Sequence, residues 1–167
     1  MPIPGVDAAR MIDTLNDHGV LYVVVGGFAV ELWDVAVLPT VDVDITPERS
    51  NENLTRLATA LNELEAVLRY GDEGVAIPGR FTAENIVDMN VLNLNTVAGP
   101  LDLTIKPAGT EGYPDLIRSA TEIEYEGMAV PTASLEDVAR SKEAAGRPKD
   151  LRTLPAIRAH IRRRSAR

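Results

Sequence analysis

The sequence predicts an α/β (α+β) domain in which helices flank a mixed β-sheet and a short helical extension follows at the C-terminus. An apolar, β-branched run at residues 22–25 is typical of a buried strand. The stretches 40–45 and 101–105 alternate apolar and polar residues, as half-buried strands do. The chain has 167 residues, of which 45% are apolar and 25% charged, so it has the size and balance of one globular domain.

Composition limits the classes of function. The chain has no cysteine, which excludes disulfides and thiolate metal sites. No apolar run approaches membrane-spanning length, and the first residues lack the charged and apolar regions of a signal peptide. We therefore expect a cytoplasmic protein that has no membrane partner. The formal net charge of −8 argues against a general nucleic-acid binder.

The charge is unevenly distributed along the chain. Residues 1–135 hold 21 acidic and 7 basic side chains, whereas residues 136–167 hold 4 acidic and 10 basic ones. Anionic ligands should therefore meet the C-terminal segment. We expect a core over 1–132 and a basic helical segment over 133–167 that packs on it, so that the two form one structural unit.

The first half of the chain alternates helical and strand patterns. The expected elements are a helix over 7–17, a strand over 22–25, a short amphipathic segment over 28–33, a strand over 40–45, a turn over 47–50 and a helix up to about Tyr70. Gly19 ends the first helix. Ser50 or Asn51 can cap the second, in which leucines recur at helical spacing as far as Leu68.

The second half is expected to contain more strands before it ends in helices. The expected elements are a loop over 71–79, a strand region over 87–97, a tight turn at 99–100, a strand over 101–105, a turn over 106–112, a short helix over 113–120 and a hairpin of 123–125 with 128–130. The loop could cover a site or simply connect two elements. Ser134 caps a helix that Gly146 ends, and Pro148 starts the last helix, which Pro155 either kinks or begins afresh.

Asp42 and Asp44 are the most informative pair of side chains. Residues two apart on a strand point to the same face, so the two carboxylates should lie side by side and repel each other. A divalent cation between them would remove that repulsion. The alternative is that the pair forms the solvated face of an edge strand.

Thr40 precedes this pair and should share its face. It is either a β-branched residue that favours a strand or a regulatory position. A phosphate on its hydroxyl would compete for Mg²⁺ and repel an incoming triphosphate.

Gly26 and Gly27 end the first strand and precede the short amphipathic segment. Glycines let backbone N–H groups approach a phosphate closely, and a following helix points its positive end there. A phosphate cradle beside a divalent-cation site is suited to phosphoryl or nucleotidyl transfer. The order of strand, Gly-Gly, helix and strand with D-x-D resembles the nucleotidyltransferase core of the DNA polymerase β superfamily.

This resemblance implies a third carboxylate on a later strand beside the first two. Asp102 lies on the alternating stretch 101–105, opposite its apolar residues, and matches that third acid. Taken alone, Asp102 would be read as a surface residue. Three carboxylates that converge on one groove at the end of the sheet can hold two Mg²⁺ ions about 3.5–4 Å apart.

The C-terminal motifs narrow the resemblance. S-L-E-D at 134–137, followed by S-K-x-x-x-G-R-x-K-D at 141–150, resembles the C-terminal signature of AbiEii-type nucleotidyltransferases, the toxins of type IV toxin–antitoxin systems. The resemblance implies that Lys142 holds the nucleotide's triphosphate and that Asp150 lies near the site. We expect the side chain of Lys142 to be exposed. Arg147 and Lys149 belong to the same motif. The alternative is that these basic side chains are the solvated faces of two exposed helices.

The resemblance implies an enzyme that moves a nucleoside monophosphate from a Mg²⁺-bound nucleoside triphosphate to an acceptor hydroxyl. The acceptor would be RNA, in particular the 3′ end of tRNA, and the protein would be a growth-inhibiting toxin with an antitoxin partner. One alternative is a small-molecule acceptor, as in antibiotic nucleotidyltransferases, which the acidic bulk of the chain favours. Another is a degenerate fold that binds a nucleotide or a partner without turnover.

Overall fold

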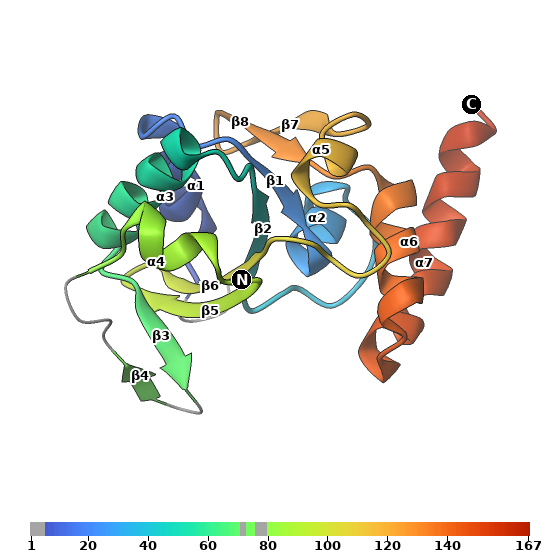
Figure 1. Ribbon diagram of the computed structural model, residues 1–167. Coiled ribbons are helices and arrows are strands. Elements are labelled where there is room, and N and C mark those ends of the chain that lie inside the picture. Colours follow the sequence, from blue (N-terminus) through green and yellow to red (C-terminus); the bar gives the residue numbers. More distant parts are fainter. Residues whose placement is uncertain (1–5, 71–72, 76–79) are drawn as a thin grey trace.

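A single mixed β-sheet runs through the whole molecule (Figure 1). The computed structural model describes residues 6–70, 73–75 and 80–167. The eight strands lie in the order β4-β3-β5-β6-β2-β1-β8-β7. Their bounds are β1 Tyr22–Val25, β2 Val43–Pro47, β3 Val67–Tyr70, β4 Glu73–Val75, β5 Val91–Thr96, β6 Gly99–Thr104, β7 Thr121–Tyr125 and β8 Met128–Thr132. β2 pairs with β6 and β1 with β8 in parallel, and the other neighbours are antiparallel. The predicted fold class is confirmed.

The helices lie at the two sides of this sheet. They are α1 Ala8–Asp17, α2 Gly26–Leu32, α3 Asn51–Glu63, α4 Ala83–Val87, α5 Tyr113–Leu116, α6 Leu135–Ala145 and α7 Pro148–Ser165. Figure 1 shows α1 and α3 together on one side of the molecule and α6 and α7 together on the other, next to α2. The apolar stripes of α1 and α3 are buried in the core with the strands. No helix of the described ranges is both long and apolar enough to cross a membrane.

Capping side chains set where several helices begin. Asp7, Ser50 and Ser134 each accept a hydrogen bond from a backbone N–H in the first turn of α1, α3 and α6, respectively. The β7–β8 hairpin turns at Glu126 and Gly127, which have φ of +49° and +79°. Two left-handed residues give a two-residue turn whose twist suits a hairpin. The predictions of these helix starts and of the hairpin are confirmed.

The helix predicted to reach Tyr70 is wrong beyond Glu63. Leu64 caps α3, and Glu65 takes a left-handed conformation with φ of +52°, which ends the helix. Residues 67–70 form β3 instead, in which Leu68 lies opposite Leu94 of β5. The leucine spacing continued past the end of α3, but strand pairing with a distant segment decided the conformation there.

The strand predicted over 40–45 begins later, at Val43, and runs to Pro47. Thr40, Val41 and Asp42 precede it, and Val41 is 56% exposed rather than directed into the core. The Thr40 hydroxyl lies 3.0 Å from the Asp42 carbonyl oxygen and 2.9 Å from Asp42 Oδ1. A side chain that bonds its own backbone in this way forms a local turn, which competes with the strand ladder.

Smaller differences occur in the second half. The loop predicted over 71–79 contains β4, and its remaining residues lie outside the described ranges. The strand region predicted over 87–97 begins only at Val91, after α4, and Gly99 and Pro100 belong to β6 rather than to a turn. α5 ends at Leu116, and α7 continues through Pro155. A proline here removes the donor to the carbonyl of Leu151, a residue that is 51% exposed.

Trp33, which follows α2, connects the C-terminal helices to the core. Its indole N–H donates to the Ala133 carbonyl at 2.8 Å, just before α6. The guanidinium of Arg164, near the end of α7, stacks over the Trp33 ring at 4.3 Å from the centroid. Both ends of the C-terminal helical pair therefore contact one side chain of the core.

Candidate active site

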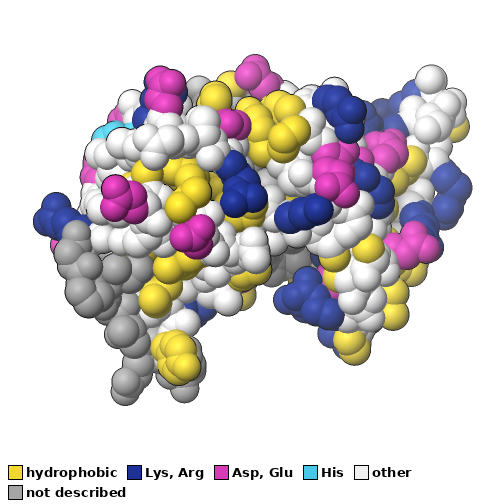
Figure 2. Space-filling model, viewed as in Figure 1, with side chains coloured by type: hydrophobic (Ala, Val, Ile, Leu, Met, Phe, Trp, Pro, Cys, Tyr) yellow, Lys and Arg dark blue, Asp and Glu magenta, His cyan; other side chains and the backbone are white. Residues whose placement is uncertain are grey.

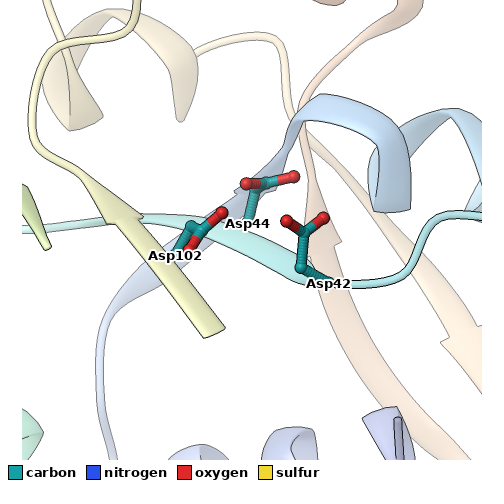
Figure 3. A group of neighbouring side chains, drawn as sticks. All are labelled: Asp42, Asp44 and Asp102. Atoms are coloured by element: carbon teal, nitrogen blue, oxygen red, sulfur yellow. The ribbon is translucent and has the colours of Figure 1, made fainter. Parts of the chain in front are cut away.

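Three carboxylates converge at the centre of the sheet. Asp44 of β2 lies directly opposite Asp102 of β6 in a parallel pairing, and Asp42 comes one residue before β2. Each offers one oxygen, and these oxygens lie within 4.8 Å of one another. Figure 3 shows the three side chains pointing into the same space. The geometry brings together the three acids that the sequence predicted as metal ligands.

The cluster is electrostatically unfavourable as it stands. Burial, followed by the negative charges of Asp42 and Asp102, raises the pKa of Asp44 to about 7, although Lys149 and Lys142 oppose the shift. Burial, followed by the hydrogen bond and charge of Asp42, raises the pKa of Asp102 to about 6 against the opposing effect of Arg69. Both carboxyl groups therefore hold a proton more tightly than usual. A cation would supply the same positive charge.

The donor set fits a hard divalent cation. Carboxylate oxygens from two neighbouring strands face one space, and Mg²⁺ prefers oxygen ligands of this kind. The hydroxyl of Thr40, 2.9 Å from Oδ1 of Asp42, is also an oxygen ligand for such a cation. The described part of the site offers neither the sulfur nor the imidazole ligands that would favour a softer metal.

Gly26 allows the backbone to pass close to this cluster. It has φ of +63°, and a Cβ placed on it would lie 2.6 Å from Oδ2 of Asp44. A Cβ on Gly27 would lie 3.1 Å from the hydroxyl of Thr40. Gly26 therefore permits this close approach, whereas a side chain at Gly27 would require Thr40 to shift by a few tenths of an ångström at the point where α2 begins.

Thr40 lies at the cluster although it is not on the strand. Its hydroxyl is 2.9 Å from Oδ1 of Asp42, and its backbone N–H donates to the carboxylate of Glu31 at 3.2 Å. Thr40 thus lies close to Asp42, as predicted, but because of a local turn and not because of strand alternation.

Asp150 organises the basic side of the site. It is 1% exposed, and its carboxylate accepts hydrogen bonds from Nε of Arg147 at 2.7 Å and from Nζ of Lys142 at 3.4 Å. Burial alone would raise the pKa of Asp150, but the hydrogen bond from Arg147 and the charges of Lys142 and Arg147 outweigh it and lower the pKa. The side chain of Lys142 is 14% exposed. Its predicted exposure is therefore wrong, because the ion pair with Asp150 draws it against α7.

The basic side chains lie within electrostatic range of the acids. Lys142 and Lys149 lower the pKa of Asp44, and the charge of Asp44 helps to raise the pKa of Arg147. Figure 2 shows the lower edge of the molecule hollowed beside α6 and α7, with Lys and Arg side chains on the helical side of the hollow. An anion beside Asp44 would therefore meet the positive charges of Lys142 and Lys149.

Arg69 is a site residue that the sequence did not reveal. From β3 its guanidinium reaches across β5 and donates to Oδ1 of Asp102. Residues 67–70 lack the alternation that marks a strand, and they continue a helical leucine pattern. Only the pairing of β3 with β5 brings position 69 beside Asp102.

Known proteins resemble the chain in structure rather than in sequence. No family model and no curated protein matches the chain. The lincosamide antibiotic adenylyltransferase LnuA, in its lincomycin-bound crystal structure, is 14% identical with a TM-score of 0.62, and the match covers 93% of this chain and 99% of LnuA. A candidate nucleotidyltransferase from Thermotoga maritima is 19% identical with a TM-score of 0.57, over 88% of this chain and 87% of that one.

A third solved structure is similar over a comparable length. The antibiotic-resistance factor ANT(2'')-Ia is 16% identical with a TM-score of 0.56, and the match covers 95% of this chain and 90% of that one. All three matches extend over nearly the full length of the chains compared, so the likeness is one of whole domains. The chain has the nucleotidyltransferase fold.

Proposed function

We propose that the protein is a Mg²⁺-dependent nucleotidyltransferase that moves a nucleoside monophosphate from a triphosphate to an acceptor hydroxyl. The observation that carries this proposal is the convergence of Asp42, Asp44 and Asp102, within reach of a basic helix pair, in a nucleotidyltransferase fold. An acid cluster of this kind is costly to keep. A protein that only bound a partner would gain nothing from three mutually repelling carboxylates.

Each group of side chains would have its own task in the reaction. Asp42, Asp44 and Asp102 would hold two Mg²⁺ ions, which would activate the acceptor hydroxyl and neutralise charge on the triphosphate. Lys142, with Arg147 and Lys149, would bind the triphosphate, and Asp150 would hold Lys142 in place. Gly26 and Gly27 would let the backbone approach the phosphates. The acceptor hydroxyl would lose its proton to water, its oxygen would bond to the α-phosphorus, and the bond from that phosphorus to the leaving pyrophosphate would break.

We propose RNA, in particular the 3′ end of tRNA, as the acceptor, and a growth-inhibiting toxin with an antitoxin partner as the biological role. The excess of basic side chains after residue 135 supports an anionic acceptor. A small-molecule hydroxyl is the second candidate. LnuA, which has a similar fold and is matched over 99% of its length, is a lincosamide antibiotic adenylyltransferase.

The test supplies the purified protein with Mg²⁺ and each labelled nucleoside triphosphate. Total RNA is the acceptor in one series, and a lincosamide or an aminoglycoside in another. Label on RNA that is lost with Asp44→Asn supports the main proposal, and label on the antibiotic supports the second candidate. If no acceptor is labelled while a nucleotide still binds, the fold binds nucleotides without turnover.

Lys142→Ala is expected to weaken triphosphate binding by about tenfold, because an ammonium close to phosphate acts as a point charge. The dissociation constant of a non-hydrolysable triphosphate, measured calorimetrically, checks this. Lys106→Ala is the matched control, since Lys106 is an exposed lysine paired with Glu111. Equal affinity in the two variants would rule out a phosphate contact for Lys142.

Thr40→Glu is expected to abolish transfer, whereas Thr40→Val keeps much of it. A carboxylate at this position adds negative charge beside Asp42, where it repels triphosphate and mimics a phosphorylated Thr40. Valine removes only the hydrogen bond to Asp42. Initial rates at saturating Mg²⁺ check this proposal of a regulatory site, and wild-type turnover by Thr40→Glu would disprove it.

A further inference from the structure

We infer that Arg69 is a positioning residue whose guanidinium is the counter-ion of Asp102 and opposes the binding of a divalent cation there. The inference rests on the cation site of the proposed function, and it concerns how readily that site is filled. Asp102 is the acid that β6 contributes, and it points into the same space as Asp42 and Asp44 from the neighbouring strand.

The ion pair is built by tertiary structure and is not an accident of two flexible side chains. The Arg69 side chain is 25% exposed and that of Asp102 15%, so neither is free in solvent. A second guanidinium nitrogen, Nη1, lies 3.5 Å from the carbonyl oxygen of Leu94 on the intervening strand. Asn93, which pairs with Asp102, lies between the two strands that carry the ion pair. These contacts fix the stem of Arg69 against β5.

The positive charge of Arg69 affects how the three carboxylates bind a cation. Three carboxylates lie within a few ångströms, and Arg69 is the only base whose contact with them is direct among the described residues. A fixed positive charge at Asp102 relieves repulsion when no cation is bound. The same charge repels an incoming cation, and it occupies an oxygen of the carboxylate that the cation would use.

Two cations should bind to the three carboxylates in a fixed order. No base among the described residues forms such a direct contact with Asp42 or Asp44, so a first cation should bind on their side. A cation at Asp102 must displace or approach Arg69. Its binding becomes favourable only when a triphosphate adds further oxygen ligands. Arg69 would thus keep the Asp102 position weak until the nucleotide arrives.

The test measures the binding of Mn²⁺ without any other ligand. Mn²⁺ replaces Mg²⁺ at oxygen sites, and the concentration of free Mn²⁺ is measured by electron paramagnetic resonance. The full chain is titrated at pH 8 without nucleotide. Arg69→Met keeps the apolar stem but removes the charge, and it should bind Mn²⁺ about tenfold more tightly than the wild type. Arg69→Gln should show the same direction, and Arg69→Lys should stay near the wild type.

Two controls isolate the effect. Arg56→Met makes the same change of net charge on α3, where Arg56 pairs with Glu52 on an exposed surface, and should leave Mn²⁺ affinity unchanged. In an Asp102→Asn background, Arg69→Met should add nothing, because the two side chains act on one interaction. A residue that merely supports the fold would lower the affinity when removed, and it would not raise it.

The outcomes separate this inference from the proposed function. Wild-type affinity, or weaker binding, in Arg69→Met and Arg69→Gln overturns the inference and leaves the transferase proposal intact. Tighter binding without any nucleotidyl transfer keeps the inference and removes the transferase. Absence of Mn²⁺ binding in every variant overturns the cation site itself, and both proposals fail with it.

Discussion

Asp44→Ala and Asp42→Ala are each expected to reduce nucleotidyl transfer by about a thousandfold, because the proposed coordination of a metal by these acids would stabilise the transition state by several kcal/mol. The fold should survive both changes. Asp44 lies among carboxylates, and removal of its charge relieves repulsion, so the free energy of unfolding should stay the same or rise. Transfer is measured with labelled triphosphate, and stability by urea unfolding in the absence of divalent cations.

The free energy of unfolding should depend on pH because Asp44 has a raised pKa in the folded protein. The pKa of Asp44 is about 7 in the folded protein and 3.8 ordinarily, so the folded state binds the proton more tightly than the unfolded state. The wild type should therefore lose stability as the pH rises from about 4 to 7 and level off above that. Asp44→Asn, which cannot ionise, should lack this loss and be more stable by roughly 2–4 kcal/mol at pH 8.

Asp13→Asn is the matched control, because Asp13 is an exposed acid on α1. It should change neither the transfer rate nor the pH profile. If Asp44→Asn unfolds more easily than the wild type at pH 8, the carboxylate stabilises the fold and the repulsion argument is wrong. If it transfers nucleotides at the wild-type rate, Asp44 holds no essential cation.

Asp150→Ala is expected to destabilise the protein by about 3 kcal/mol, since it removes the buried partner of two basic side chains. Arg147 is 61% exposed and can return to water, but Lys142 is largely buried and would keep an uncompensated charge. Asp150 also lies in the first turn of α7, where a negative charge is favourable. Urea unfolding at pH 7 measures the loss.

Glu52→Ala provides the comparison for this change. Glu52 is likewise an acid in the first turn of a helix, but its side chain is 76% exposed and its partner, Arg56, is also accessible. Its replacement should cost about 0.5 kcal/mol or less. Equal losses in the two variants would mean that burial of Asp150 contributes nothing. Since Asp150 would no longer orient the Lys142 ammonium, triphosphate binding should weaken together with stability.

The linkage of Asp150 predicts a further pH effect with the opposite sign to that of Asp44. Its pKa is lowered in the folded protein, so its stabilising contribution is present above its ordinary pKa and is lost as the pH falls through the folded value. Acid should thus weaken the attachment of α7 while it relieves the repulsion at Asp44. Asp150→Ala should remove the first effect of acid on stability, and Asp44→Asn should remove the second.

Local sequence signals determined much of this fold. The apolar run of β1, the glycine pair after it, the cap at Ser134 and the turn at Glu126 and Gly127 act over a few residues, so their conformations follow from side-chain chemistry close by. The alternation around Asp102 likewise placed that acid on a strand face. Asp42 and Asp44 could be recognised as a pair because they are two residues apart, even though Asp42 proved to precede the strand.

Only the tertiary structure decided which distant residues meet. The parallel pairing of β2 with β6 puts Asp44 opposite Asp102, and the pairing of β3 with β5 turned a leucine-rich stretch into a strand that carries Arg69 to the same carboxylate. The burial of Asp150 draws Lys142 inward, which its surface-like neighbourhood in the sequence did not indicate. The physical reason is that strand pairing and charge pairing are gained between segments far apart in the chain, and no short window of sequence contains both partners.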